Sequence, residues 1–165
     1  MTREYEATLD SLVQLGWSVE RLSQRQTLPD EILKRYPGMP LDHREFVETT
    51  GIVASPSATA WLVTSCVFTG TSDLAYAWNE WEQQSLEAAE KDLALRTSIE
   101  RFWDRHLPIV MSVKSGYAYL ALDLNTLQIV RGEEPLYEES SLLASSLHEM
   151  FSLVVNRDPR VQRWV

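Results

Sequence analysis

The residues of this chain whose types and spacing could do chemistry are four glutamates in its last third. They surround a short apolar segment, and the stretch consists of Glu133, Glu134, Pro135, Leu136, Tyr137, Glu138 and Glu139. Paired carboxylates can act as acid and base in glycoside hydrolysis, and they can also bind a cation. A solvated surface loop explains the same acids more simply. We therefore expect no catalytic residue among them.

Histidines offer a second chemistry, and the chain contains three of them: His43, His106 and His148. They are far apart in the sequence and each falls on a predicted helix, so a three-histidine metal site would require a coincidence of the fold. Capping or surface roles are the expectation for them. Asp104 and His106 are two residues apart on a predicted helix and do not face one another. No nucleophile elbow, phosphate loop or zinc-protease motif occurs, and we predict no catalytic residue, cofactor or metal.

The charge of the chain restricts the kind of partner that it can bind. The 165 residues carry a net charge of −9, and the stretch from Thr71 to Glu149 contains fourteen acidic residues but only six basic ones. Such a surface repels nucleic acid and attracts a basic protein. Solubility alone would also explain an acidic balance. We predict a protein partner, no nucleic acid and no membrane.

Composition predicts one soluble globular domain. Hydrophobic residues make up 44% of the chain and charged residues 24%, which does not fit a membrane span. The N-terminal stretch contains Glu4, Glu6 and Asp10 where a secretory signal needs a basic start and an apolar run, so we expect a cytoplasmic protein. The lone Cys66 cannot form an internal disulfide, and its apolar surroundings in the sequence favour a buried structural thiol.

The helices that must position these residues can be predicted from periodicity and capping signals. Leu9, Leu12 and Val13 fall at helical spacing, which indicates an N-terminal helical segment within residues 1–26. Further helices are predicted to start at residues 28–31, 42–45, 79–82, 97–100 and 146–149. The helix from 42–45 should end near Gly51, and the helix from 97–100 should end at Pro108.

The strands follow from runs of β-branched, aromatic and alternating residues. They are predicted at 59–69, ending before Gly70, and at 109–113, 117–124 and 127–130. Residues 114–116 form a short polar connection of the hairpin type. Alternation within 117–124 predicts one core face, with Leu120 and Leu122 on it. Strands that follow one another directly predict an antiparallel sheet covered by helices, which is an α+β fold, in a single domain of residues 1–165.

The order of these segments resembles the SUKH superfamily, which includes the Smi/Knr-like proteins. The resemblance rests on LPDEILKRY, AWLVTSCVF, YAWNEWEQQSLEAAEKD, FWDRHLPI, GYAYLALD, GEEP and ASSLHEMF, all from residue 28 onward. It implies a sheet with helices packed around it, and recognition without catalysis. Bacterial members of the superfamily act as immunity proteins that neutralise cognate toxins, often nucleases. Fungal relatives are linked to cell-wall synthesis and signalling.

Protein binding is therefore the expected function, and two surfaces are candidates for it. In the first, the acids of residues 133–139 attract a basic toxin, with Pro135, Leu136 and Tyr137 as the apolar centre. The second contains two tryptophans and two neighbouring acids: Trp78, Glu80, Trp81 and Glu82. Core packing is the stronger expectation for both tryptophans, and exposure for their charged neighbours. A regulatory adaptor and a small carboxylate hydrolase are the alternatives.

Three arginines near the end of the sequence leave two interpretations open. Arg157, Arg160 and Arg163 fit a solvated tail, and they also fit a contact within a dimer. The sequence favours neither interpretation.

Overall fold

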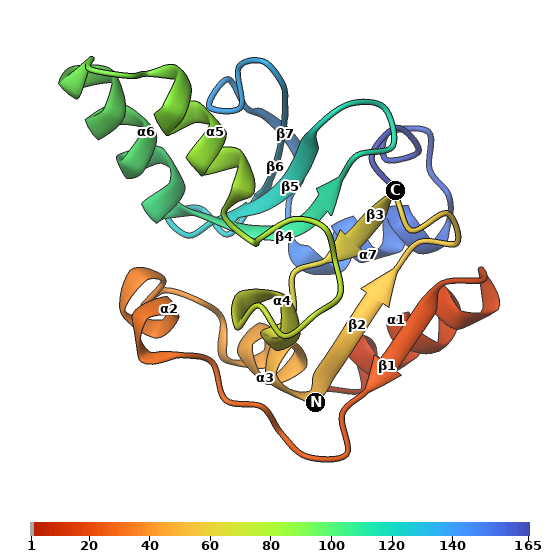
Figure 1. Ribbon diagram of the computed structural model, residues 1–165. Coiled ribbons are helices and arrows are strands. Elements are labelled where there is room, and N and C mark those ends of the chain that lie inside the picture. Colours follow the sequence, from red (N-terminus) through yellow and green to blue (C-terminus); the bar gives the residue numbers. More distant parts are fainter. Residues whose placement is uncertain (1) are drawn as a thin grey trace.

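The fold is built on one sheet of seven antiparallel strands, in which every strand pairs with the next strand along the chain. The computed structural model describes residues 2–165 and is drawn in Figure 1. Its strands are β1 (Ser18–Arg21), β2 (Thr50–Ala54), β3 (Ala60–Leu62), β4 (His106–Ser112), β5 (Ala118–Asp123), β6 (Ile129–Glu133) and β7 (Ser141–Ala144). The predicted α+β class with an antiparallel sheet is confirmed.

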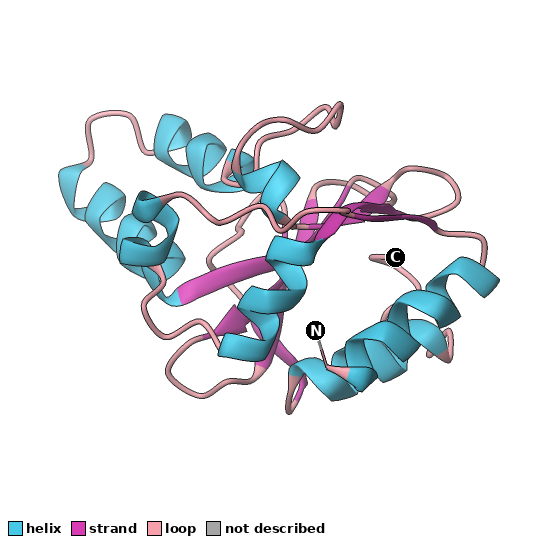
Figure 2. Cartoon of the chain, turned by 90° about the horizontal axis from the view of Figure 1, so that it is seen from below, coloured by secondary structure: helices cyan, strands magenta, loops and turns pink. Residues whose placement is uncertain are grey.

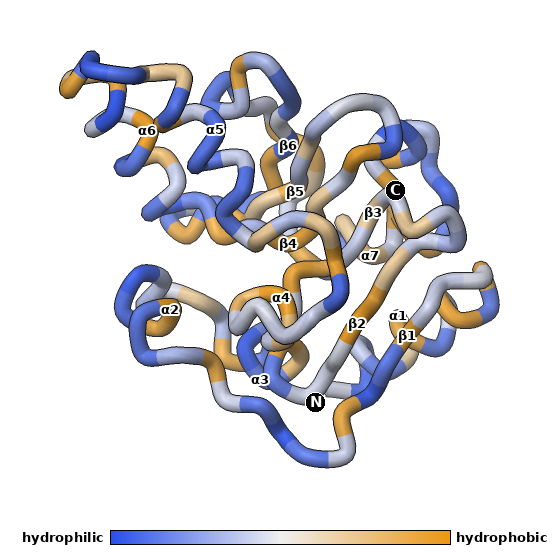
Figure 3. Tube along the Cα trace, in the orientation of Figure 1, coloured by the Kyte–Doolittle hydropathy of each residue, from blue (hydrophilic) through white to orange (hydrophobic). Residues whose placement is uncertain are grey.

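Helices cover both faces of this sheet. They are α1 (Arg3–Gln14), α2 (Asp30–Arg35), α3 (Leu41–Thr49), α4 (Ser65–Phe68), α5 (Glu80–Ala88), α6 (Leu93–Arg105) and α7 (Leu147–Val155). Figures 1 and 2 show α1 beside α7 on one side of the sheet, and α5 paired with α6 on the other. Hydrophobic stretches follow the inner strands and α4, whereas hydrophilic stretches occupy the outer loops (Figure 3).

Strand β5 is buried on both faces, although its alternating sequence predicts one core face. Leu120 and Leu122 are buried as expected, but Tyr119 and Ala121 on the opposite face are buried too. The ring of Tyr119 lies 4.8 Å from the ring of Trp103 on α6. Because helices pack on both sides of this central strand, alternation between polar and apolar residues cannot report which side is core.

The strand predicted at residues 59–69 is wrong in its second half. Only Ala60–Leu62 is a strand, and Ser65–Phe68 forms the short helix α4. The N–H of Phe68 donates to the carbonyl of Thr64, a helical i to i−4 bond of 3.0 Å. A short apolar run fits a buried strand and a buried helix equally well. On this helix Cys66 is half-buried, with Sγ 3.4 Å from Oε1 of Gln26, so its thiol is less buried than we expected.

Two helix starts also differ from the prediction. Helix α3 follows Pro40 and begins at Leu41, so Asp42 is not its cap; the carboxylate of Asp42 accepts the N–H of His43 instead. Helix α6 begins at Leu93, four residues before Thr97, because the carboxylate of Asp92 accepts the N–H of Leu95 at 3.0 Å. A cap depends on the side-chain rotamer and backbone at that position, which the spacing of residue types does not fix.

Two other capping predictions have different outcomes. Asn79 does precede α5, but its side chain makes no capping bond. Ser146 caps α7, since its hydroxyl accepts the N–H of Glu149 at 3.1 Å. The carboxylate of Glu149 in turn accepts the N–H of Ser145 at 2.8 Å, one residue before the cap.

The strands at the two edges of the sheet were not predicted. Residues 18–21 form β1 inside the segment expected to be helical, and 141–144 form β7 inside the segment expected to be a loop. Each has only four residues, too few to show a pattern. Strand β2 was not predicted either, and Gly51, expected at the end of a helix, lies within it. The remaining differences are shifts, since β6 begins at Ile129 and β4 extends back to His106.

Candidate protein-binding surface

Tyr137 lies at the point where the two predicted surfaces meet, and it is buried. It is 4% exposed, its ring stacks on Trp81 with centroids 5.8 Å apart, and its hydroxyl donates to Oε1 of Gln84 at 2.8 Å. Its carbonyl accepts the hydroxyl of Tyr119 at 2.5 Å. Tyr137 is therefore not the exposed apolar centre that we predicted. It anchors residues 134–140 to α5 and β5.

The close fit of this loop depends on a glycine beneath it. Gly132 lies in β6 opposite Tyr119, and a Cβ at Gly132 would collide with the Tyr119 ring and hydroxyl. Because glycine leaves that space free, Tyr119 can reach the carbonyl of Tyr137. The loop is thus tied down from below by a buried tyrosine.

The exposed apolar part of the loop is its tip, formed by Pro135 and Leu136. Leu136 is 56% exposed, among the more exposed large hydrophobic side chains of the described residues. The carbonyl of Leu136 accepts the N–H of Glu139 at 3.0 Å, which closes the turn. These two residues replace Tyr137 as the apolar contact that this surface presents to solvent.

The four glutamates of the loop divide into two sets. Glu133 pairs with Arg163 at 3.0 Å, and together with Glu139 these residues line a shallow pocket of about 200 Å³ that also includes Arg131. The charge on that side is mixed. Glu134 instead accepts the N–H of Tyr117 at 3.0 Å, and Glu138 accepts Nε1–H of Trp103 at 2.8 Å. These donors are neutral, so they do not offset the charge of Glu134 and Glu138 as a cation would.

Glu80 of α5 completes a group of three carboxylates around Tyr137. Burial raises the pKa of the Tyr137 phenol, and the negative charges of Glu134, Glu138 and Glu80 raise it further. Among residues 2–165, no lysine or arginine forms an ion pair with any of the three. We call Glu80, Glu134 and Glu138 the acidic cluster. It combines residues from both surfaces predicted from the sequence.

An aromatic stack supports the acidic cluster from inside. The ring of Trp81 lies 4.8 Å from Tyr117 and 5.3 Å from Tyr76, in addition to its contact with Tyr137. The hydroxyl of Tyr76 donates to that of Tyr117 at 3.3 Å, and this hydrogen bond raises the pKa of Tyr76. Tyr76 and Tyr117 are half-buried. The cluster therefore sits on packed rings rather than on a flexible loop.

The other residues of the second predicted surface are buried or half-buried. Trp81 is 2% exposed, as core packing predicted, but Glu82 is only 4% exposed, so the expected exposure of this acid is wrong. Both carboxylate oxygens of Glu82 bind Arg35, at 2.6 and 2.9 Å. Trp78 is half-buried, and the Arg35 guanidinium lies 5.4 Å from the centre of its ring. Trp78, just before α5, and Glu82 on α5 therefore connect this helix to α2, because Arg35 supplies the cation that a buried carboxylate needs.

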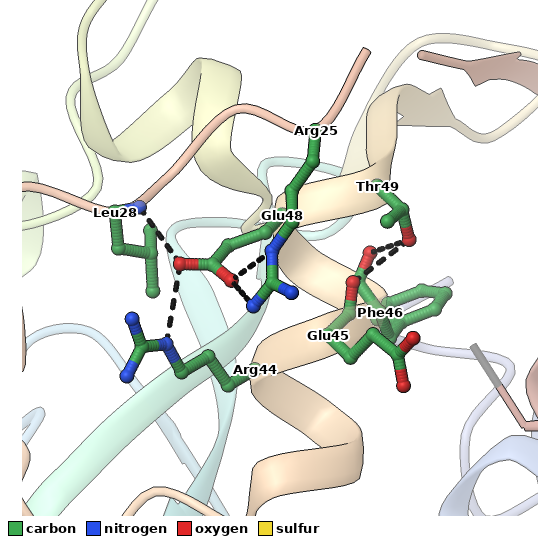
Figure 4. A network of polar contacts seen from close by, with 7 residues as sticks. All are labelled: Arg25, Leu28, Arg44, Glu45, Phe46, Glu48 and Thr49. Atoms are coloured by element: carbon green, nitrogen blue, oxygen red, sulfur yellow. Dashed lines mark hydrogen bonds and ion pairs between the residues drawn. The ribbon is translucent and has the colours of Figure 1, made fainter. Parts of the chain in front are cut away.

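A second buried carboxylate, Glu48, was not singled out from the sequence. Its carboxylate accepts the N–H of Leu28 at 3.0 Å and hydrogen bonds from Arg44 at 3.2 Å and Arg25 at 2.8 Å. Figure 4 shows these three donors around it. Burial opposes ionisation, but these donors hold the pKa of Glu48 below its ordinary value. A carboxylate held in this form joins the segment before α2 to α3, and it is unsuited to donating a proton.

The three histidines have separate partners. His43 is 1% exposed and lies 3.4 Å from the Tyr5 hydroxyl, and burial lowers its pKa to about 4. His106 is also buried, with Nδ1 2.8 Å from the carbonyl of Phe102. The expected capping or surface role is therefore wrong for His43. His106 is the C-cap residue of α6, and its ring contacts a carbonyl of the last turn, in agreement with a capping role. His148 is exposed and lies 3.8 Å from Glu4. In the described part of the chain, no three His, Cys, Asp or Glu side chains are grouped to hold a metal ion.

The C-terminal arginines belong to a folded segment rather than to a solvated tail. Val161 and Trp164, which are next to these arginines in the sequence, are buried. Arg160 pairs with Asp158 at 3.0 Å, and the guanidinium of Arg163 lies 5.9 Å from the ring centre of Trp164. Across residues 2–165, every helix is too short or too polar to span a bilayer.

The acidic cluster, the aromatic stack beneath it and the Pro135–Leu136 tip are thus the features of this chain best suited to contact a protein. Comparison with known proteins adds no name to this surface: no protein-family model, no curated protein and no solved structure matches the chain.

Proposed function

We propose that this chain is a non-catalytic protein-binding module that uses the acidic cluster and the Pro135–Leu136 tip to bind a basic protein. In this proposal the chain is an immunity protein of the SUKH type, acting in the cytoplasm, and the partner is a cognate toxin domain, often a nuclease in that superfamily. Binding blocks the active surface of the toxin, without chemistry on the part of this chain.

The observation that carries the proposal is the unpaired charge of Glu80, Glu134 and Glu138. The donors that bond to them are a backbone amide, an indole and a side-chain amide, and within the described residues none of the three forms an ion pair. Three unpaired charges on one surface accelerate the approach of a positively charged partner and favour it over an acidic one. A nuclease surface, which binds phosphates, carries the complementary charge.

The Pro135–Leu136 tip supplies an apolar anchor, which the acidic cluster does not provide. Interfaces concentrate binding energy in a few apolar or aromatic anchors surrounded by a polar rim. Leu136 is the exposed anchor here, and the buried Tyr137 beside it fixes the loop to α5. A loop that is ordered before binding loses less conformational entropy when the partner docks.

A regulatory adaptor of the cell-wall-signalling type would use the same surface with a different partner. A hydrolase built on carboxylates would need an acid with a raised pKa. Hydrogen-bond donors instead lower the pKa of Glu149 and Asp158, and the pKa of Glu48 is lowered despite its burial. These three carboxylates are therefore unsuited to act as that acid.

The experiment is a capture of partners from a lysate of the native organism, at low and at moderate salt, with retained proteins identified by mass spectrometry. The test variant reverses the acidic cluster to lysine, as Glu80→Lys, Glu134→Lys and Glu138→Lys. The matched control reverses three exposed acids elsewhere, as Glu31→Lys, Asp73→Lys and Glu100→Lys. Both variants have the same net charge.

The expected result is a basic protein that the native chain and the control retain at low salt, and that the test variant loses. Moderate salt should weaken its retention, because exposed charges are screened beyond about 8–10 Å. Equal retention by both variants would contradict the proposal. Signalling proteins in place of a toxin would favour the adaptor.

A further inference from the structure

A cleft on the side of the molecule away from the α5–α6 pair is a hollow that no part of the proposed function uses. Its volume is about 400 Å³, within the range of roughly 300–1,000 Å³ that is typical of small-molecule sites. Its walls come from the end of α1, the turn between β2 and β3, the end of α7 and the C-terminal segment, which lie close together in Figure 1.

The lining of this cleft is apolar with a positive rim. Leu15, Trp17, Val154 and Val161 contribute apolar wall, and the positive charges come from Lys114 and Arg157. No aspartate or glutamate side chain of the described residues lines it. This is unusual for a chain whose net charge is −9. Apolar walls with one or two placed charges suit a small molecule that has an apolar body and a negative end.

Arg157 is the cation best placed to hold that negative end. The acid next to it in sequence, Asp158, is taken up by Arg160, with two hydrogen bonds of 3.0 and 3.2 Å. Among the described residues, no carboxylate forms an ion pair with Arg157. Its backbone lies in the left-handed region, at φ 52°. A non-glycine residue in that conformation is uncommon and must be held by its surroundings.

Hydrogen bonds within the protein hold the walls of the cleft in place without a ligand. The ammonium of Lys114 donates to the carbonyl oxygens of Gln162 and Val165, at 2.7 and 2.5 Å, and so holds the C-terminal segment against the β4–β5 connection. The side-chain amide of Gln162 donates to the carbonyl of Arg157 at 2.7 Å. A site ordered in this way spends little binding energy on its own rearrangement.

We propose that this cleft binds a small amphipathic carboxylate, with the carboxylate on Arg157 and the apolar body between Trp17, Val154 and Val161. The site is separate from the acidic cluster, so it does not depend on the proposed function. It would make the chain a receptor for a small anionic molecule, and its occupancy would stabilise the C-terminal segment.

The probes are 4-(trifluoromethyl)phenylacetate and its neutral amide, titrated against the intact protein by fluorine NMR. They match in shape and differ in charge. Because a net charge of −9 repels anions at long range, a preference for the acetate requires a local cation. The expected result is saturable binding in the millimolar range or tighter, with the amide at least roughly fivefold weaker.

Three variants locate the site. Arg157→Asn, whose short side chain tolerates a left-handed backbone, should weaken acetate binding roughly fivefold and leave the amide unchanged. Arg101→Gln removes an exposed arginine from α6 and should change neither affinity. Ser57→Phe places a ring in the cleft and should abolish binding of both probes. Any one of three results would overturn the proposal. They are the absence of saturable binding up to about 10 mM, equal affinity for the acetate and the amide, and equal effects of Arg157→Asn and Arg101→Gln.

Discussion

Replacing Glu48 by alanine should be among the most destabilising single changes in this protein. The carboxylate has no exposed surface and accepts hydrogen bonds from the N–H of Leu28 and from two arginines. Without it the N–H of buried Leu28 loses its partner, which costs about 1–3 kcal/mol. Arg25 and Arg44 are 53% and 30% exposed, so they can turn to water and add only about 0.5 kcal/mol each. The expected loss is about 2–4 kcal/mol of unfolding free energy.

Urea denaturation followed by tryptophan fluorescence measures this loss, provided that the slope of the transition is unchanged. Glu48→Gln should fall between the native protein and Glu48→Ala, because its amide oxygen can still accept the N–H of Leu28. Exposed Glu31→Ala is the control and should stay within about 0.5 kcal/mol of the native value. A cost below about 1 kcal/mol for Glu48→Ala would refute the role assigned to this carboxylate.

The pH dependence gives an independent check on Glu48. Its pKa in the folded protein is lower than in the unfolded chain, so the unfolded chain takes up the proton first as the pH falls. The stabilisation is fully present above about pH 4.3 and is lost as the pH falls through the folded pKa. Glu48→Gln should therefore differ from the native protein at pH 7 and approach it in strong acid.

Three further perturbations test other parts of the structure. The pKa of His43 is about 4 in the folded protein and about 6.5 in an unfolded chain. As the pH falls from 6.5 towards 4, the unfolded chain takes up the proton first, so the unfolding free energy should fall by up to about 1.4 kcal/mol per pH unit. An NMR titration that gives the His43 ring a pKa above 6 would contradict this. Gly132→Ala should lower the unfolding free energy by about 1–3 kcal/mol, because the new Cβ collides with Tyr119; a neutral result in thermal denaturation would mean that the ring has room to move. Trp103→Phe keeps a ring against Tyr119 but removes the hydrogen-bond donor to Glu138. It should lower the unfolding free energy by about 1 kcal/mol and accelerate hydrogen exchange in residues 134–140. Unchanged exchange would show that this hydrogen bond does not hold the loop.

Local signals in the sequence were sufficient to predict several elements of the fold. Ser146 caps its helix through bonds within four residues of itself, and the α+β class follows from strands that succeed one another directly. The class depends only on the order of elements, so boundary errors such as the late start predicted for α6 did not affect it.

Burial of polar residues could not be predicted, because it depends on partners distant in the sequence. Glu82 was expected to be exposed, like the other acid beside the tryptophans, because its partner Arg35 is distant in the sequence and is brought to it only by the fold. Tyr137 looked like the centre of a surface because glutamates flank it, whereas Trp81 and Gln84 are what bury it. Glu48 was not singled out, because its spacing from Arg44 is also typical of an exposed pair on a helix, and only the fold brings Arg25 and the N–H of Leu28 to it.

The contact between α1 and α7 has a consequence for how the protein emerges from the ribosome. Tyr5 on α1 packs edge-on against Phe151 on α7, with ring centroids 5.7 Å apart, so α1 needs a partner that is synthesised after the whole sheet. The strands between them pair in order of synthesis and can form as they emerge. We expect the apolar face of α1 to stay uncovered until α7 has emerged, which makes it the natural binding site for a chaperone on the nascent chain.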